Sequence, residues 1–412
     1  MKKPFAGPSL ADFEAAREVV SKVAQVTPLE ESRALSNILG SRVVLKCENL
    51  QRTGSYKVRG AYFRLNQLTD EEKSRGVVAA SAGNHAQGVA LAAHQLGIHS
   101  TIFMPIGVAL PKLLATREYG ADVVLRGDTF TESLAAAIDF SEKSGAVFIP
   151  PYDDPDVIAG QGTLGLELLE QLDGIDTVIV PVGGGGLIAG LSSAIKQKAA
   201  ETGRKIRVIG VQSENVAPYP KSLKAGKPVA ITMQPTIADG ISVALPGTLN
   251  FEIIKNTVDD FVTVSDDDIA RALVVLLERA KLVVEPAGAA GIAAIMAGKI
   301  KKAAGTTIAI LSGGNIDPKV MEKILSHGLV ASGRYMRIRI PLPDRPGQLA
   351  RIAEIVAGLN ANVVEVLHTR HGTGLQITQV ELDVDIETRG HEHAAQVLEA
   401  LRAEGYDPKV GY

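Results

Sequence analysis

The feature that most limits the possible folds is a regular alternation of patterns between about residues 77 and 332. Short apolar runs rich in β-branched residues are followed by glycine-rich turns and then by Ala- and Leu-rich stretches with helical spacing. The runs are continuous, which is typical of strands buried on both faces of a parallel sheet, and parallel strands need crossovers, so the pattern predicts an α/β fold. The predicted strands are 76–80, 101–104, 122–125, 147–149, 178–180, 208–211 and 307–311, and the predicted helices include 88–96, 132–143, 187–198 and 266–281.

The alternation is interrupted at two places. Pro150 and Pro151 and the acidic residues after them predict a passage between two lobes. Beyond residue 333 the pattern becomes an alternating strand (335–342), a helix to about 359, strands at 362–369 and 376–385, a charged helix at 391–404 and a short last strand. This βαββαβ order in about 80 residues predicts a separate ferredoxin-like module.

Composition excludes several classes of protein. Lys and Arg number 43 against 46 Asp and Glu, and the net charge of −3 gives no reason to expect a nucleic-acid partner. The single cysteine, Cys47, excludes an internal disulfide and a multi-cysteine zinc site. No apolar stretch approaches the ~20 residues of a membrane span, and the first residues carry no secretory pattern. A soluble, cytoplasmic protein without a membrane partner is expected.

The segment TGSYKVRGA (53–61) places Lys57 one turn inside a predicted helix, after a start of small residues. The positive end of a helix favours the neutral amine, which is the form that attacks a carbonyl group. Taken alone, Lys57 fits a solvated surface lysine better than a functional one.

The segment SAGNHAQG (81–88) lies directly between a predicted strand and a predicted helix. Its small residues expose backbone amides that suit an anionic carboxylate, and Asn84 is placed to contact a cofactor oxygen. The structural alternative is an ordinary turn in which Asn84 caps the helix.

Four consecutive glycines, Gly183 to Gly186, followed by Leu187, open the helix after the predicted strand 178–180. Glycines and a helix N-terminus together predict a phosphate-binding loop. The stretch from Gly184 to Ala189 also fits a loose G-x-G-x-x-A pattern, so a nicotinamide-dependent oxidoreductase is an alternative. That alternative lacks the acidic residue expected at the end of the next strand, where Gln212 and Ser213 follow Val211.

Ser312 follows the last strand of the α/β region, at the edge where such sheets bind ligands, and Glu285 precedes another small-residue helix. A primary amine, a phosphate loop, a carboxylate-binding turn and a neutral hydroxyl are together the groups that pyridoxal phosphate needs.

On these motifs the chain resembles the biosynthetic-type threonine dehydratases (threonine ammonia-lyases), which are fold-type-II, tryptophan-synthase-β-like pyridoxal-phosphate enzymes. The resemblance covers about residues 10–330 and implies a two-lobed catalytic region at 1–330, with a smaller lobe at about 55–150. Cysteine synthases differ from this pattern in having Asp after the lysine, where Val58 stands here. The resemblance assigns Lys57 as the lysine joined to the cofactor aldehyde and Ser312 as the partner of the pyridine nitrogen. It assigns the phosphate to Gly183, Gly184, Gly185, Gly186 and Leu187, and the substrate carboxylate to Ser81, Ala82, Gly83, Asn84 and His85, with Asn84 also contacting the phenolic oxygen.

The activity implied is β-elimination of L-threonine to 2-oxobutanoate and ammonia, the first step of isoleucine biosynthesis, with L-serine giving pyruvate. Lys57 would remove the α-proton, and Ser81 or the cofactor phosphate would protonate the leaving hydroxyl. Related serine racemases carry a serine where Ala82 stands, and their divalent-metal site needs acids where Gln212 and Pro218 stand. We therefore expect no efficient racemisation and no bound divalent metal, while a monovalent cation stays open. Serine dehydratase/racemase and hydroxyaspartate ammonia-lyase activities also stay open as alternatives.

The tail resembles an ACT regulatory domain, for which residues 333–412 are assigned. Its turn contains Asp344, Arg345, Gly347 and Leu349, and the resemblance implies that this turn binds an amino acid, isoleucine or its possible antagonist valine. A helix N-terminus beside a glycine would receive the carboxylate. A dimerisation module without a ligand, or a non-catalytic amino-acid sensor, are the alternatives. The resemblance implies a homodimer or a homotetramer.

Overall fold

The computed structural model describes residues 7–370 and 379–411. The chain forms two compact units, Met1–Pro318 and Lys319–Tyr412. The division falls ahead of the predicted 330–333 boundary, because α14 (Pro318–Ala331) is grouped with the second unit. Ile324 and Gly328 are the residues of this helix that are buried.

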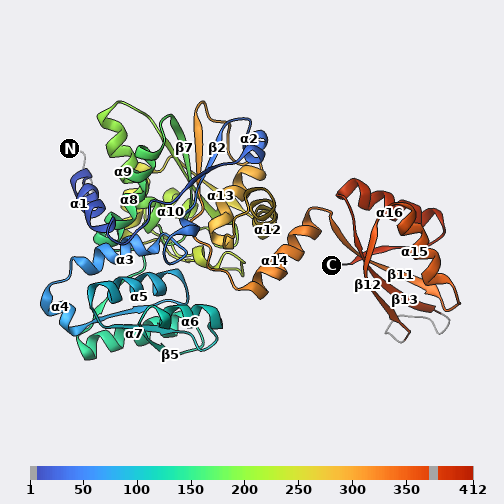
Figure 1. Cartoon of the computed structure of the whole chain (residues 1–412), viewed down its shortest axis with the longest axis horizontal. Helices are drawn as coiled ribbons and strands as arrows, with labels where there is room; N and C mark the ends of the chain where they lie inside the picture. The colour runs from blue at the N-terminus through green and yellow to red at the C-terminus, as the bar shows by residue number, and fades with distance from the viewer. Residues whose placement is uncertain (1–6, 371–378, 412) are drawn as a thin grey trace. The chain divides into compact units, whose positions relative to one another are not determined.

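The first unit contains two sheets, which lie in separate lobes (Figure 1). The larger sheet has the order β1-β2-β10-β7-β8-β9 and is parallel except for the antiparallel edge pair β1–β2. Its strands are β1 (Leu29–Glu31), β2 (Val43–Lys46), β7 (Ile175–Pro181), β8 (Arg207–Ser213), β9 (Asp260–Val264) and β10 (Thr306–Ile310). The smaller sheet, of order β5-β4-β3-β6, is wholly parallel. Its strands are β3 (Val77–Ala80), β4 (Ser100–Met104), β5 (Asp122–Leu125) and β6 (Val147–Phe148).

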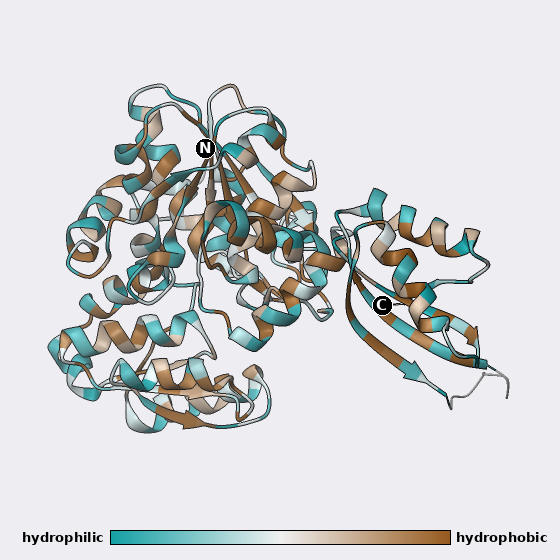
Figure 2. Ribbon diagram, turned by 45° about the vertical axis from the view of Figure 1, so that its right-hand side comes forward, coloured by the Kyte–Doolittle hydropathy of each residue, from teal (hydrophilic) through white to brown (hydrophobic). Residues whose placement is uncertain are grey.

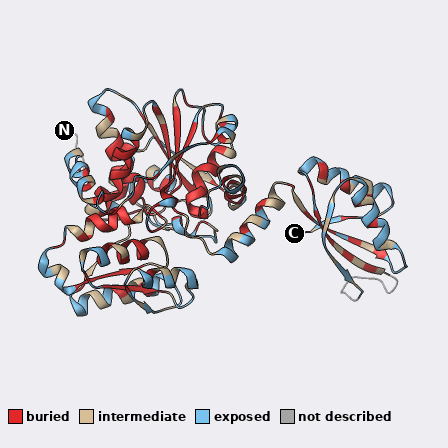
Figure 3. Cartoon of the chain, in the orientation of Figure 1, coloured by how far each residue is buried: buried red, intermediate tan, exposed pale blue. Residues whose placement is uncertain are grey.

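Helices cover both sheets, and most of the apolar strands lie inside them, as the brown strands of Figure 2 and the red strands of Figure 3 show, whereas the edge strand β5 is largely exposed. The helices of the first unit are α1 (Leu10–Val20), α2 (Arg33–Leu39), α3 (Lys57–Asn66), α4 (Asp70–Arg75), α5 (Asn84–Leu96), α6 (Leu110–Glu118), α7 (Phe130–Ser144), α8 (Pro155–Gln171), α9 (Gly186–Glu201), α10 (Pro218–Ala225), α11 (Thr248–Thr257), α12 (Asp266–Val275) and α13 (Pro286–Met296). Short 3-10 turns occupy η1 (Glu48–Leu50) and η2 (Asp239–Ile241), and η3 (Leu276–Ala280) is a π-turn.

Helix α8 is the buried centre of the first unit and fixes the position of α3. At Gly160 a Cβ atom would lie 2.6 Å from the carbonyl oxygen of Arg59 and 2.7 Å from the Cα of Gly60, so α3 and α8 touch through their backbones. Farther along, Gly162 meets Gly190 of α9 in the same way. Because a side chain at these positions would push the helices apart, the glycines set how closely α3 sits over the sheet.

The second unit has the predicted βαββαβ order around its own core. After α14 come β11 (Tyr335–Pro343), α15 (Gln348–Gly358), β12 (Asn362–Thr369), β13 (Gln379–Glu387), α16 (His391–Ala403) and β14 (Lys409–Gly411). The strands form an antiparallel sheet of order β12-β13-β11-β14. The start of the predicted 376–385 strand lies outside the described residues.

The α/β fold with a C-terminal βαββαβ unit is thus confirmed, and every predicted strand of the α/β region is present. The predicted helical segment 266–281 is present, but its last turn is not α-helical: α12 passes into the π-turn η3, and the segment ends at Lys281 with φ +61°. Among the described residues no helix is both long and apolar enough to cross a membrane.

Candidate active site

Lys57 is the first residue of α3, at the helix start itself and not a turn inside it as the sequence suggested. The residues before it are bound to the segment that follows β10: Ser55 forms an isolated bridge with Gly313, and the Tyr56 amide donates to the Ser312 carbonyl oxygen at 3.2 Å. From the smaller lobe, Gly88 of α5 approaches the Lys57 backbone so closely that a Cβ atom would lie 3.1 Å from its carbonyl carbon. The lysine is therefore fixed by elements of both lobes.

The Lys57 amine donates a hydrogen bond to the carbonyl oxygen of Pro151 at 2.8 Å. Burial lowers its pKa to about 8, and the nearby Glu285 carboxylate opposes this shift. The sequence predicted the direction of this shift, but its main cause is burial, which the sequence argument did not use. At pH 7 a pKa of about 8 leaves about a tenth of the amine in the neutral form that attacks a carbonyl group.

The turn of Ser81, Ala82 and Gly83 follows β3 and leads into α5, which begins at Asn84. The Gly83 amide donates to Ser81 Oγ at 3.1 Å, which leaves the serine hydroxyl hydrogen available to another acceptor. His85 is buried, and its Nε2 lies 3.0 Å from the carbonyl oxygen of Ile149. Burial and then the charge of Lys57 lower the His85 pKa to about 3, so the ring is neutral and donates from Nε2 to this oxygen.

Asn84 joins two further residues into one polar bridge. Its Nδ2 donates to Glu285 Oε1 at 2.7 Å, and Asn315 Nδ2 donates to its Oδ1 at 2.8 Å. Burial raises the pKa of Glu285 to about 7, with a further increase from Asp239, while the Asn84 hydrogen bond, Lys112 and Lys57 lower it. The sequence noted Glu285 only as a carboxylate ahead of a helix and did not single out Asn315, although its place after a strand and two glycines was a usable signal.

The glycine loop between β7 and α9 packs tightly against two tyrosines. A Cβ atom at Gly184 would lie 2.5 Å from ring carbons of Tyr152, and one at Gly185, where φ is +102°, would collide with the Tyr219 hydroxyl. Tyr219 Oη donates to the Gly184 carbonyl oxygen at 3.0 Å, and Asn250 Nδ2 donates to the same oxygen at 3.1 Å. The glycines are therefore required by packing on these side chains, which no sequence pattern indicated.

The amides of Gly183 to Leu187 donate to no protein acceptor within residues 7–370 and 379–411. All of these residues except Gly183 are buried, and unpaired buried N–H groups are rare in folded proteins. Since they also lie at the N-terminus of α9, they form a site for an anion.

These groups converge at the carboxyl ends of the strands. The carbonyl oxygen of Pro151 accepts the hydrogen bond of the Lys57 amine, and the ring of the next residue, Tyr152, packs on Gly184. Pro151 and Tyr152 therefore connect the amine to the glycine loop. On the other side, Ser312 is buried two residues after the end of β10, and its carbonyl oxygen accepts a hydrogen bond from the Tyr56 amide at 3.2 Å. The structure thus brings the predicted cofactor and substrate residues of the first unit together.

The predicted regulatory residues lie in the second unit, at the turn between β11 and α15. Gly347 is the N-cap of α15 with φ +90°, and a Cβ atom there would meet nothing within 4 Å. Asp344 forms an ion pair with Arg370 at 3.5 Å, Arg345 is exposed, and Leu349 is 44% exposed. The turn is an open, partly apolar helix N-terminus.

The two positions at which related racemases carry metal ligands have other tasks here. Gln212 Nε2 donates to the Val182 carbonyl oxygen at 3.2 Å, and its Oε1 accepts from the Tyr219 amide at 3.1 Å. Pro218 is the first residue of α10. Within the part of the chain that the structure describes, no group of three or more His, Cys, Asp or Glu side chains is arranged to hold a metal ion.

Comparison with known families defines the class of protein. Residues 20–313 match the model of the pyridoxal-phosphate dependent enzyme family, and residues 336–405 match the ACT domain. A nicotinamide oxidoreductase and a non-catalytic sensor, which the sequence left open, do not agree with the first match.

The relatives narrow this class. The L-threonine ammonia-lyase of Thermotoga maritima is 46% identical over 98% of this chain and 99% of that protein, and the enzyme of the same name from Geobacter sulfurreducens is 46% identical over 92% and 94%. Among solved structures, the processed threonine deaminase isoform 2 of Solanum lycopersicum aligns with a TM-score of 0.73 at 40% identity, covering 79% of this chain and 95% of that one. Maize serine racemase aligns with the same TM-score at 33% identity, covering 77% and 97%. The chain belongs to the L-threonine ammonia-lyase family of pyridoxal-phosphate dependent enzymes.

The residues present fit the cofactor of this family. The unpaired amides of Gly183 to Leu187 suit its phosphate, and the Lys57 amine, with its pKa lowered to about 8, suits its aldehyde. Ser312 is a neutral partner at the strand end between them.

Proposed function

We propose that this protein converts L-threonine to 2-oxobutanoate and ammonia, and L-serine to pyruvate and ammonia. The observation that carries this proposal is the 46% identity to an L-threonine ammonia-lyase over 98% of the chain. The convergence of Lys57, the Ser81–His85 turn after β3 of the smaller sheet and the glycine loop after β7 of the larger sheet supports it.

The residues would hold the cofactor as follows. Lys57 Nζ joins its aldehyde, the amides of Gly183 to Leu187 hold its phosphate, and Ser312 faces its ring nitrogen. Asn84 contacts its phenolic oxygen while remaining bonded to Glu285 and Asn315. When bound, pyridoxal phosphate supplies an electron sink that makes the α-proton of an amino acid removable.

The chain's own groups then move the protons. Lys57 Nζ, neutral in part because burial lowers its pKa to about 8, takes the proton from the substrate Cα. Ser81 Oγ, whose lone pair already accepts the Gly83 amide, gives a proton to the leaving β-oxygen. The hydroxyl group leaves as water, and a second water releases the nitrogen as ammonia, so that threonine yields 2-oxobutanoate without an added oxidant or reductant.

The turn of Ser81 to His85 would bind the substrate carboxylate. Because the side chain of Ala82 cannot carry a proton, this arrangement favours elimination over racemisation. Glu285, which accepts a hydrogen bond from Asn84 of this turn, and Asp239 of η2 would disfavour a second carboxylate, which argues against hydroxyaspartate as the preferred substrate.

The second unit would regulate the first through the turn of Asp344, Arg345, Gly347 and Leu349. Its open helix N-terminus suits an amino-acid carboxylate, and the exposed Leu349 suits the branched side chain of isoleucine or valine. We place the enzyme at the first step of isoleucine biosynthesis in the cytoplasm, as a homodimer or homotetramer. We retain residues 1–330 as the catalytic region, with a smaller lobe at about 55–150, and residues 333–412 as the regulatory domain.

The test couples ammonia release to L-threonine, L-serine and threo-3-hydroxyaspartate with the purified holoenzyme. Threonine is expected to give the highest kcat/KM. Absence of ammonia release from threonine, with release from either other substrate, would replace the proposed activity by that one.

A further inference from the structure

A cation from the smaller lobe lies over the substrate turn and is paired across the site with an acid of the larger lobe. Lys112, on α6, donates from Nζ to Asp239 Oδ2 of η2 at 3.0 Å. Its side chain is 21% exposed, whereas that of Asp239 is 65% exposed. The same ammonium lies 4.0 Å from the point where a Cβ atom of Gly83 would stand.

The segment that holds Asp239 is part of the wall of the site. A Cβ atom at Gly183 would lie 3.0 Å from the Cα of Ile241, so η2 abuts the glycine loop. A Cβ atom at Gly240 would lie 3.5 Å from Glu285 Oε1, so η2 also abuts the Asn84–Glu285 bridge. The Lys112–Asp239 pair therefore spans from the substrate turn to the opposite wall, between groups of the site.

We propose that Lys112 is a substrate-positioning residue, whose ammonium attracts the α-carboxylate of the amino acid to the Ser81–Asn84 turn, and that Asp239 competes with the substrate for this ammonium. This inference rests on the proposed amino-acid substrate. It adds a charged contact to a turn that otherwise offers backbone amides and neutral side chains.

The pair has the energetics that such an exchange needs. An ion pair with one partner mostly in water holds its ammonium weakly, by about 1 kcal/mol or less. A carboxylate held at the turn by amides as well can displace that partner, because charge-assisted hydrogen bonds act together with the amides there. If the ion pair served only to join the two lobes, removing either partner would break the same contact, and both variants would change KM in the same direction.

The test uses the holoenzyme and two variants with opposite expected effects. Removing the cation in Lys112→Met should raise KM for L-threonine about tenfold, with a smaller change in kcat. Removing its competitor in Asp239→Asn should lower KM about threefold. Measurements at pH 8.5 keep Glu285, whose pKa is raised to about 7, ionised throughout. Lys112→Arg, which keeps the charge, should stay within about threefold of the original KM.

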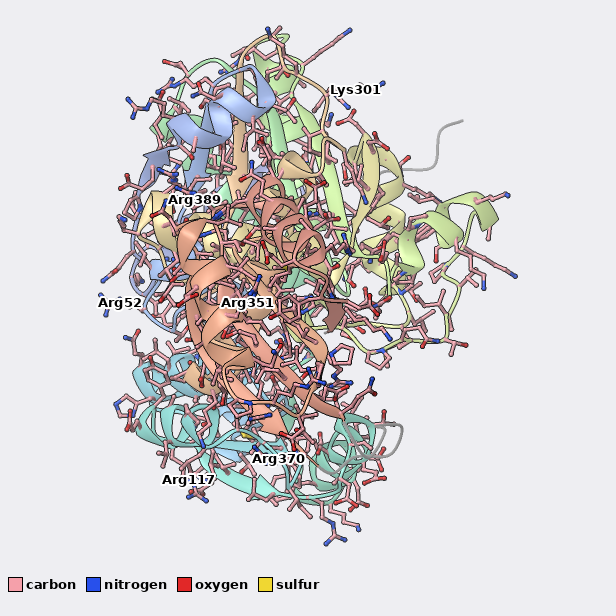
Figure 4. All side chains as sticks on the ribbon, turned by 90° about the vertical axis from the view of Figure 1, so that its right-hand side faces the viewer. Arg52, Arg117, Lys301, Arg351, Arg370 and Arg389 are labelled. Carbon is pink, nitrogen blue, oxygen red and sulfur yellow. The ribbon has the colours of Figure 1, made fainter. Side chains whose placement is uncertain are left out.

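Binding without turnover gives a second readout. L-Alanine has no β-hydroxyl to eliminate, and L-alaninamide lacks the carboxylate, so their dissociation constants can be read from the change in the visible spectrum of the holoenzyme. Lys112→Met should raise the dissociation constant of L-alanine about tenfold and leave that of L-alaninamide unchanged. Arg117→Met serves as the matched control, because Arg117 is exposed on the same helix and points away from the protein (Figure 4).

The outcomes separate this inference from the proposed function. If Lys112→Met and Asp239→Asn change KM in the same direction, the pair is structural and the inference is overturned. The inference is also overturned if Lys112→Met weakens the binding of L-alaninamide as much as that of L-alanine. Absence of threonine turnover in the unaltered enzyme would instead count against the proposed function, while the L-alanine comparison would still test Lys112.

Discussion

A partly buried lysine and a buried carboxyl group determine the chemistry of the site at the scale of single residues. Burial lowers the pKa of Lys57 to about 8 and raises that of Glu285 to about 7, so both pKa values lie within about one unit of neutral pH. Asn84 joins Glu285 to the substrate turn, and Pro151 holds the amine. Perturbed pKa values of this kind, grouped at strand ends, are what a catalytic site requires.

The raised pKa of Glu285 predicts a stability that falls with pH in the cofactor-free protein. Between pH 4.5 and about 7 the folded chain retains a proton that the unfolded chain has lost, so the free energy of unfolding decreases by up to about 3 kcal/mol. Glu285→Gln removes this decrease, and its unfolding free energy relative to the unaltered chain should rise across that window and level off above pH 7. Urea unfolding at a series of pH values measures it.

The control for this series is Glu142→Gln, which removes an exposed carboxylate from α7. The difference in unfolding free energy between this variant and the unaltered chain should stay nearly constant with pH. A constant difference for Glu285→Gln as well would contradict the assignment of Glu285 as a carboxyl that is protonated near neutral pH.

At the scale of elements, glycines determine how the helices and loops of the site fit together. Gly160 lets α3 rest on α8, Gly88 lets α5 reach the Lys57 backbone, and Gly185 takes a φ of +102° beneath Tyr219. At these three glycines the backbone itself makes the close contacts, because no side chain stands in the way. The amides of the glycine loop stay available for a ligand.

The loop makes a specific prediction. Gly185→Ala combines a strained φ with a collision against Tyr219, so the affinity of the cofactor-free protein for pyridoxal phosphate should fall about tenfold or more. Gly174→Ala is the matched control, because φ is +72° there and a Cβ atom meets nothing within 4 Å. It should cost about 1 kcal/mol of stability and leave the affinity unchanged. Titration with the cofactor measures the affinity of each variant, and equal affinities for the two variants would contradict the account of the loop.

Sequence patterns predicted the elements and motifs but not the contacts between distant segments. The continuous apolar runs identified the parallel strands, and the run of four glycines identified the anion loop, because both are local properties of the chain. Tyr152, Tyr219 and Asn250, which hold that loop, come from three separate segments with no motif of their own. The π-turn after α12 was likewise missed, since an Ala- and Leu-rich pattern does not distinguish it from a regular helix.

At the scale of the whole molecule, the chain consists of two units with separate cores. The core of the second unit draws only on residues between Met336 and Leu401, and the cores of the first unit draw on none of these. We therefore expect each unit to unfold as a cooperative unit of its own.

Hydrogen exchange followed by mass spectrometry tests this separation in the full chain. Adding pyridoxal phosphate should slow exchange in peptides of residues 7–318, and adding isoleucine should slow it in peptides of the β11–α15 turn. The two units should also reach full exchange at different denaturant concentrations. A single concentration at which all peptides exchange together would contradict two independently stable units.

The most direct test of the central claim is to find the atom that carries the cofactor. The holoenzyme is reduced with borohydride, digested and mapped by mass spectrometry, with Lys46 and Lys112 as the neighbouring lysines for comparison. The account predicts a single stable adduct on the peptide that contains Lys57, and its loss in Lys57→Ala. An adduct on another lysine, or an unmodified Lys57 peptide in a protein that still releases ammonia from threonine, would contradict it.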